Sequence, residues 1–273
     1  MSEDWLEIRR GAAPLVVSIP HTGLDLRGLE ARLVSPWRAR KDADWFVESL
    51  YDFARELDAT IVRTRMSRTV IDVNRDPSGA SLYPGQATTG LCPLTTFDGE
   101  PLYQAGEGPD EAEVAARRTA YYEPYQLALA QEIARLQAVH GAIALYDCHS
   151  IRSVIPRLFE GELPKFNLGT NSGASADAAL VDRVRGILAA SGESFVVDGR
   201  FKGGWITRYF GRPTDGVHAL QMELACRAYL DEPIGPVDET NWPVPYQADY
   251  AAKTRGVLRE ILTAMLAFVE GAA

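Results

Sequence analysis

The stretch Ala142-Ile143-Ala144-Leu145-Tyr146-Asp147-Cys148-His149-Ser150 decides the fold class of this chain. Its apolar first half predicts a buried strand, and its polar second half places a metal-competent imidazole where that strand ends. A second histidine, His21, follows the apolar run 15–19 in the same way. In open α/β folds, ligands and chemistry gather at the carboxyl ends of the strands. Because the chain has only four histidines, two in matching positions indicate one shared site, with a catalytic metal centre as the obvious candidate.

The composition describes a globular protein and argues against several classes of partner. With 273 residues and 46% hydrophobic content, the chain can bury one substantial core. Its formal net charge of −9 argues against nucleic-acid binding, which needs a basic footprint. The three cysteines form no CxxC pair, and neither a signal-peptide pattern nor a membrane-length apolar run is present. We therefore expect a cytoplasmic monomer or small homo-oligomer with no nucleic-acid or membrane partner.

Strand and helix patterns alternate along the chain. We expect strands at 15–19, 60–64, 69–73, 142–147, 195–197 and 217–224, and helices from Asp42 or Asp44 to about 57, at 110–140 with a kink at Pro124, at 176–190 and at 247–269. This alternation predicts a single α/β domain over 1–273, with a mixed, mostly parallel sheet covered by helices on both faces. Two loop-rich segments, 76–109 and 151–175, are longer than ordinary connections, so we expect them to border the active site.

A hydrolytic zinc site needs about three protein ligands and one open position for water. His21 and His149 supply two, and the third is expected from the segment 42–44 at the start of the first predicted helix. We favour Asp44, because it directly precedes an aromatic pair that must pack towards the core. The alternatives are Asp42, Asp25 and Asp147, the last of which would otherwise orient His149 from outside the ligand set.

Glu223 is the candidate general base. It lies in the predicted strand 217–224, where alternation puts Gln221 and Glu223 on one face and His218 and Met222 on the other. A buried carboxylate is costly unless it has a partner or a chemical role. Beside a metal, Glu223 could take a proton from water and return it to the leaving amine. The structural alternative is a strand-end glutamate paired with an arginine.

Arginines cluster in the loops of this acidic chain. Asn74 and Arg75 could grip a substrate carboxylate, for which a guanidinium offers bidentate geometry. Arg68 could face a developing oxyanion. Arg152 and Arg208 are the candidates for a second carboxylate. The segment that holds Arg208, 199–208, also carries Arg200, a glycine pair and aromatic residues, and is expected to be a substrate-closing loop. A small dianionic substrate would explain these arginines.

A thiol mechanism is the main rival, because Cys148 adjoins His149. Adjacent residues at a strand end usually point apart, whereas a catalytic cysteine and histidine must converge, so this alternative is disfavoured. The chain has no phosphate-binding loop, no convincing dinucleotide fingerprint and no nucleophile elbow.

Over nearly its whole length the sequence resembles the N-formylglutamate amidohydrolases (N-formylglutamate deformylases) of histidine degradation. The resemblance is carried by the segments 18–23, 42–45, 71–75, 89–94, 147–152, 167–170, 199–204 and 218–223. That family is distantly similar to zinc carboxypeptidases and aspartoacylase, which share a phosphorylase/hydrolase-like α/β fold. The resemblance implies metal-dependent hydrolysis of N-formyl-L-glutamate to L-glutamate and formate.

The resemblance also implies a ligand set of two histidines and one carboxylate, a late glutamate base, and an Asp-x-Asn-Arg segment for substrate carboxylate, matched by 72–75. The implied cofactor is one divalent ion, zinc first and cobalt second. The distantly similar zinc carboxypeptidases and aspartoacylase take their carboxylate ligand three residues after the first histidine, where this chain has Leu24, so the carboxylate must come from elsewhere. Two other functions stay open, a related deacylase of another N-acyl amino acid or short peptide, and a non-catalytic small-acid binding protein.

Overall fold

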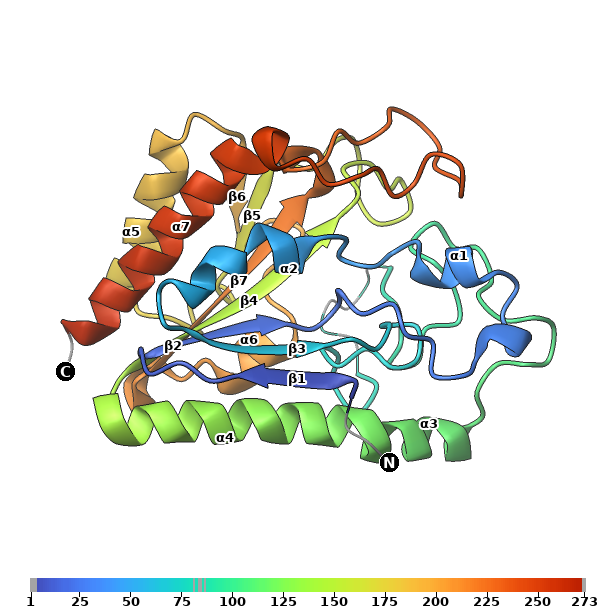
Figure 1. Cartoon of the computed structure of the whole chain (residues 1–273), viewed down its shortest axis with the longest axis horizontal. Coiled ribbons are helices and arrows are strands. Elements are labelled where there is room, and N and C mark those ends of the chain that lie inside the picture. The colour runs from blue at the N-terminus through green and yellow to red at the C-terminus, as the bar shows by residue number, and fades with distance from the viewer. Residues whose placement is uncertain (1–3, 81, 83–84, 86, 272–273) are drawn as a thin grey trace.

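A computed structural model describes residues 4–80, 82, 85 and 87–271. Within these residues seven strands form one sheet, in the order β1-β3-β2-β4-β7-β5-β6 (Figure 1). The strands are β1 (Leu6–Arg9), β2 (Leu15–Ile19), β3 (Thr60–Thr64), β4 (Ile143–Ile151), β5 (Phe166–Gly169), β6 (Phe195–Val197) and β7 (Val217–Ala225). The central strands β3, β2, β4 and β7 run parallel, so their carboxyl ends meet at one edge. β1 and β5 pair antiparallel with β3 and β7, which confirms the predicted mixed sheet.

Helices cover both faces of this sheet. They are α1 (Pro36–Arg40), α2 (Val47–Leu50), α3 (Glu111–Arg117), α4 (Glu123–His140), α5 (Ala178–Ala190), α6 (Trp205–Phe210) and α7 (Ala248–Glu270). One core joins α2, α5 and α7 to the sheet, and a second core joins α4 and α6 to the opposite face (Figure 1). None of the described helices is long and apolar enough to cross a membrane.

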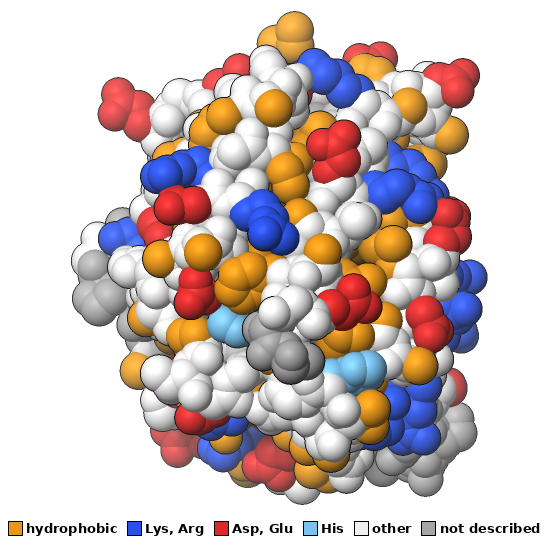
Figure 2. Space-filling model, turned by 90° about the vertical axis from the view of Figure 1, so that its left-hand side faces the viewer, with side chains coloured by type: hydrophobic (Ala, Val, Ile, Leu, Met, Phe, Trp, Pro, Cys, Tyr) orange, Lys and Arg blue, Asp and Glu red, His pale blue; other side chains and the backbone are white. Residues whose placement is uncertain are grey.

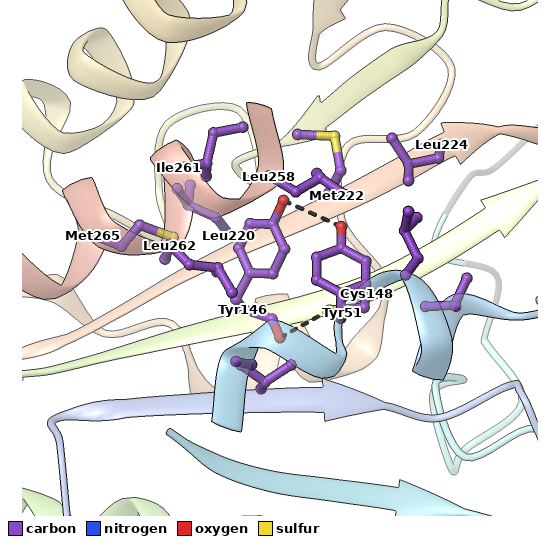
Figure 3. Packing of buried hydrophobic residues seen from close by; sticks show 14 of the residues in the cluster. Tyr51, Tyr146, Cys148, Leu220, Met222, Leu224, Leu258, Ile261, Leu262 and Met265 are labelled. Atoms are coloured by element: carbon purple, nitrogen blue, oxygen red, sulfur yellow. Dashed lines mark hydrogen bonds between the residues drawn. The ribbon is translucent and has the colours of Figure 1, made fainter. Parts of the chain in front are cut away.

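Strand alternation divides β4 and β7 between the two cores. Tyr146 and Leu220 pack with α7 on one face, whereas Leu145 and Ala219 belong to the core beneath α4 (Figure 3). All nine residues of β4 are buried, because both faces are covered, and this accounts for its continuous apolar run. Away from the cores, Figure 2 shows one face of the molecule, where acidic and basic side chains are interspersed instead of gathering by sign.

The expected helix from Asp42 or Asp44 to about 57 is wrong as a single element. The segment instead contains α2 and a short 3₁₀ turn, Asp52–Arg55. Phe46 has a φ of 61°, a left-handed conformation that ordinary residues adopt only under constraint, and the helix begins after it. The helix therefore cannot reach back to Asp44, whose side chain is directed at His21 and His149.

The expected strand 69–73 is also wrong. This segment forms turns, with the Val70 amide bonded to the Ser67 carbonyl and the Asp72 amide to the Leu91 carbonyl. Residues 68–74 are all buried, because they pack across the carboxyl edge of the sheet. Burial without pairing produced a strand-like apolar pattern.

The remaining elements match the expectations with a few additions. The pattern 110–140 is interrupted by a π turn, Arg118–Tyr122, directly before Pro124, which lies in the first turn of α4. Short elements were missed: β1, α1, β5 inside the expected loop 151–175, and α6 inside the expected loop 199–208. Each has six residues or fewer, and none has the run of consecutive apolar residues that revealed β2.

Candidate metal centre and active-site pocket

Three buried side chains converge at the carboxyl edge of the parallel strands. His21 follows β2, His149 lies in β4, and Asp44 precedes α2. One ligand atom from each lies within 4.8 Å of the other two. The Asp44 amide donates to the His21 carbonyl at 3.0 Å, which fixes the α2 loop against the end of β2. The structure thus brings together the three residues that the sequence predicted.

The donor atoms of this triad fit a divalent cation. Asp44 Oδ2 lies 3.1 Å from His149 Nδ1 and 3.7 Å from His21 Nδ1. Among the described residues, His21 Nδ1 and Asp44 Oδ1 are buried without a hydrogen-bond partner, a costly state that a bound cation would relieve. Burial alone would raise the pKa of Asp44, but the two histidines outweigh it and hold the pKa well below its usual range. Two imidazole nitrogens and one carboxylate form a zinc-type donor set.

The alternative aspartates are engaged elsewhere. Asp42 accepts from the Phe97 amide at 2.6 Å, and Asp25 pairs with Arg27 at the surface. Asp147 Oδ2 lies 2.9 Å from His149 Nε2, on the side of the ring away from Asp44. Asp147 therefore occupies the orienting position that was its predicted alternative role.

His21 has an orienting carboxylate of its own, which sequence reasoning missed. Asp72 Oδ1 lies 2.7 Å from His21 Nε2, and Asp72 Oδ2 accepts from Arg68 at 2.7 Å. Burial alone would raise the pKa of Asp72, but His21, Arg75 and Arg68 hold it well below its usual range. Each histidine therefore presents Nδ1 to the triad and Nε2 to a carboxylate. The available signal was Asp72 itself, a carboxylate inside the apolar run that precedes Asn74.

Replacing Asp72 with Asn is expected to weaken zinc binding by about 10- to 100-fold, because the amide cannot hold the His21 tautomer as a carboxylate does. The measurement is a competition titration of zinc against a chromophoric chelator. Asp76→Asn is the matched control, since Asp76 accepts from Ser78 in an exposed turn. Equal zinc affinities of the Asp72 variant and the unaltered protein would contradict this role.

Glu223 lies beside the triad. It is the register partner of His149 on the adjacent strand, so the two side chains share one sheet face. Its side chain is buried, and burial raises the pKa of Glu223 to about 7, against a lowering influence of His149. Gln221 Nε2 donates to Glu223 Oε2 at 3.2 Å. A carboxyl with a raised pKa in a cleft is a general-base candidate.

A pocket opens onto His21, His149 and Glu223, and three arginines line it: Arg68, Arg75 and Arg200. The Arg68 guanidinium lies over the Phe97 ring, 4.8 Å from its centroid. Arg75 donates to Thr89 at 3.0 Å. Both expected loop segments contribute walls, with Phe97 from 76–109 and Leu158 from 151–175. The pocket therefore combines a metal-competent centre with positive charge.

Two of the predicted substrate arginines do not line this pocket. Arg152 pairs with Asp98 at 2.6 Å and with Asp42 at 3.4 Å. The Nε of Arg208 donates to the Gly203 carbonyl at 2.8 Å. Arg200, from the same expected loop, lies in the pocket instead, and its guanidinium donates to the backbone carbonyls of Leu158 and Ala87.

Asn74 and Cys148 are both engaged within the protein. The Asn74 amide nitrogen lies 2.9 Å from Asp147 Oδ2 and 2.8 Å from His149 Nε2, so this side chain contacts the orienting carboxylate. Cys148 lies on the opposite sheet face among Tyr51, Tyr146 and Met222 (Figure 3). Burial raises its pKa well above the usual range. A thiol that is buried and directed away from His149 does not support the thiol mechanism.

Comparisons with known proteins find relatives over nearly the whole chain. The family model for N-formylglutamate amidohydrolase matches residues 13–230. The chain is 46% identical over 268 residues to the N-formylglutamate deformylase of Pseudomonas aeruginosa, covering 97% of each chain. It is 44% identical over 265 residues to the N-formylglutamate deformylase of Pseudomonas putida, covering 96% of each. The crystal structure of N-formylglutamate amidohydrolase from Ralstonia eutropha shares the fold, with a TM-score of 0.76, 23% identity and 97% coverage of both chains.

Proposed function

This chain belongs to the N-formylglutamate amidohydrolase family, and we propose that it hydrolyses N-formyl-L-glutamate to L-glutamate and formate. One observation supports this function above all. The pocket that contains His21, His149 and Glu223 is also lined by three arginines, in a protein whose formal net charge is −9. Local positive charge in an acidic protein suits a small substrate with two carboxylates. The proposed setting is histidine degradation, as the sequence resemblance implies.

The proposed cofactor is one zinc ion held by His21, Asp44 and His149, with cobalt as a substitute. The fit rests on the buried donor atoms of this triad and on the carboxylates behind both histidines. Such an ion, when bound, supplies Lewis-acid polarisation of the formyl carbonyl and a lowered pKa for water at its open position. The protein side chains perform the remaining steps.

Glu223 acts as the proton carrier in this proposal. Its carboxylate accepts a proton from the attacking water and later delivers that proton to the amine nitrogen of glutamate, so that the amine leaves as a neutral group. Arg68 is the proposed oxyanion partner, because its buried guanidinium lines the same pocket and lies over Phe97. Asp72 and Asp147 keep the two imidazoles oriented throughout.

Arg75 and Arg200 are the proposed carboxylate-binding residues. Arg75 occupies the position that the family resemblance assigns to substrate carboxylate, which leaves Arg200 for the carboxylate of the glutamate side chain. The backbone carbonyls of Leu158 and Ala87 accept hydrogen bonds from the Arg200 guanidinium and hold it at the pocket. Arg200 therefore replaces Arg152 and Arg208 in this role.

Replacing Arg200 with Met is expected to raise KM for N-formyl-L-glutamate by about 10- to 100-fold, the cost of one charge-assisted hydrogen-bond pair. The KM for N-formyl-L-glutamine should change little, because that substrate has no side-chain carboxylate. Arg212→Met is the control, since Arg212 lies in an exposed turn with 55% of its side chain accessible. An equal increase in KM for both substrates would show that Arg200 does not bind the side-chain carboxylate.

The acyl specificity tests the proposed function itself. Phe97, Ile151, Leu158 and Phe201 form apolar walls of the pocket. A pocket that fits a formyl group should discriminate against the extra methyl of N-acetyl-L-glutamate by about 10- to 200-fold in kcat/KM. Faster release of a larger acyl group would favour the related deacylase. Tight substrate binding without hydrolysis, at full zinc or cobalt occupancy, would favour the small-acid binding protein.

A further inference from the structure

Two buried amide side chains connect the start of α6 to the reacting groups. Asn74 Oδ1 accepts from the Ile206 amide at 2.8 Å, while its nitrogen donates to Asp147 at 2.9 Å. Gln221 Oε1 accepts from the Gly204 amide at 2.6 Å, while its nitrogen donates to Glu223 at 3.2 Å. The first amide thus reaches the carboxylate behind His149, and the second reaches the base.

The orientation of Gln221 follows from its partners. A backbone amide can only donate, so the Gly204 amide requires the oxygen of Gln221 on its side. The nitrogen of Gln221, which can only donate, is then directed at Glu223. Gln221 and Glu223 are two residues apart on β7, face the same way, and are 4% and 8% exposed. The hydrogen bond therefore forms away from bulk water, where it constrains the carboxylate most.

Gly204 makes this arrangement possible. A Cβ atom at this position would lie 2.5 Å from the side-chain nitrogen of Asn74, closer than real Cβ contacts allow. The backbone at Gly204 can therefore approach both amide side chains only because the residue has no side chain. The close fit holds the Gly204 amide in front of Gln221 and keeps the orientation of Gln221 fixed.

We infer that Gln221 is a positioning residue for the general base. It holds Oε2 of Glu223 and leaves Oε1 to accept the proton of the attacking water. The inference rests on the proposed function, because it assigns Gln221 a task only if Glu223 is the base. Gln221 also lines the pocket, but its side-chain oxygen and nitrogen are engaged by Gly204 and Glu223, so we expect its effect on turnover to pass through the carboxylate.

A double-mutant cycle tests this inference. Gln221→Met keeps the side-chain volume and removes the donor, and it is expected to lower kcat by about 10- to 100-fold, with KM and zinc content little changed. In a Glu223→Ala background no carboxylate is left to position, so the same replacement should alter residual turnover less than about threefold. Equal decreases in kcat in both backgrounds would mean that Gln221 acts independently of Glu223, through protein stability or direct contact with substrate, and would overturn the inference.

A second variant decides the matter if Gln221→Met does not fold. Gln221→Glu can still accept from the Gly204 amide, but it presents an acceptor to Glu223 in place of the donor. Its kcat should fall at least as far as that of Gln221→Met; unaltered kcat would overturn the inference.

Gln126→Met is the control for losing a glutamine contact, since Gln126 donates to the Val73 carbonyl outside the pocket lining. Absence of formate release by the unaltered protein would overturn the proposed function as well, whereas active protein with equal losses in the cycle overturns only the role of Gln221.

Discussion

Replacing Glu223 with Gln is expected to lower kcat for formate release by about 10³-fold, while the variant keeps one zinc ion per chain. The amide has nearly the same shape as the carboxylate but cannot accept a proton from water at neutral pH, and general-base catalysis typically contributes 10²- to 10⁴-fold. Zinc should remain because the metal-competent triad consists of His21, Asp44 and His149. The measurements are steady-state formate release and metal content of the same preparation.

Glu260→Gln is the control for this variant, because Glu260 is an exposed residue of α7 and is not among the pocket-lining residues. It should match the unaltered protein in both measurements. Normal turnover by the Glu223 variant would remove Glu223 from the mechanism. A loss of zinc together with activity would instead assign Glu223 to the ligand set.

Replacing Asp44 with Asn is expected to abolish stable zinc binding and to lower formate release by about 10³-fold, since the metal contributes several kcal/mol of transition-state stabilisation. Asp44 is the anionic member of the triad, and a neutral amide is a much poorer ligand. The measurement is zinc content after dialysis against a weak chelator, together with formate release. Excess zinc in the assay should restore part of the activity.

Asp42→Asn is the matched comparison, two residues before Asp44 in the same loop. Asp42 accepts from Phe97 and Arg152 and not from either triad histidine, so this variant should retain zinc. If the Asp42 variant lost zinc and the Asp44 variant kept it, Asp42 and not Asp44 would be the carboxylate ligand.

The sequence predicted the placement of His21, His149 and Glu223 because each follows from strand geometry. β2, β4 and β7 are apolar runs buried on both faces, and parallel pairing brings their carboxyl ends to one edge. Alternation along β7 puts Gln221 and Glu223 on one face, and the register with β4 makes it the face of His149. These features depend on local pattern and on one topological rule, so a single sequence sufficed.

The arginine assignments needed the tertiary structure. Arg200 and Arg208 lie eight residues apart in one segment, and the sequence pattern does not distinguish which of them lines the pocket, as Arg200 does. Arg152 follows β4 closely, yet Asp98 and Asp42 hold it outside the cleft. A long arginine side chain can reach several sites. Its partner therefore depends on the conformation of the surrounding loops, which a short sequence motif does not predict.

The role of Asp72 was hidden for a related reason. It lies in a buried turn that resembles a strand in its apolar pattern, and the contact with His21 joins residues 51 positions apart. Asp44, in contrast, was predicted as a ligand although its expected helix was wrong. The left-handed Phe46 ends the loop just after Asp44 and leaves its carboxylate facing the histidines.

The most direct test of the proposed metal-dependent hydrolysis is formate release from N-formyl-L-glutamate by the purified protein, before chelation, after complete chelation, and after zinc or cobalt is restored. The proposal predicts release that is lost on chelation and regained with either ion. Full activity in protein shown to be free of metal would contradict the account, because His21, Asp44 and His149 would then have no part in the reaction that Glu223 is proposed to assist.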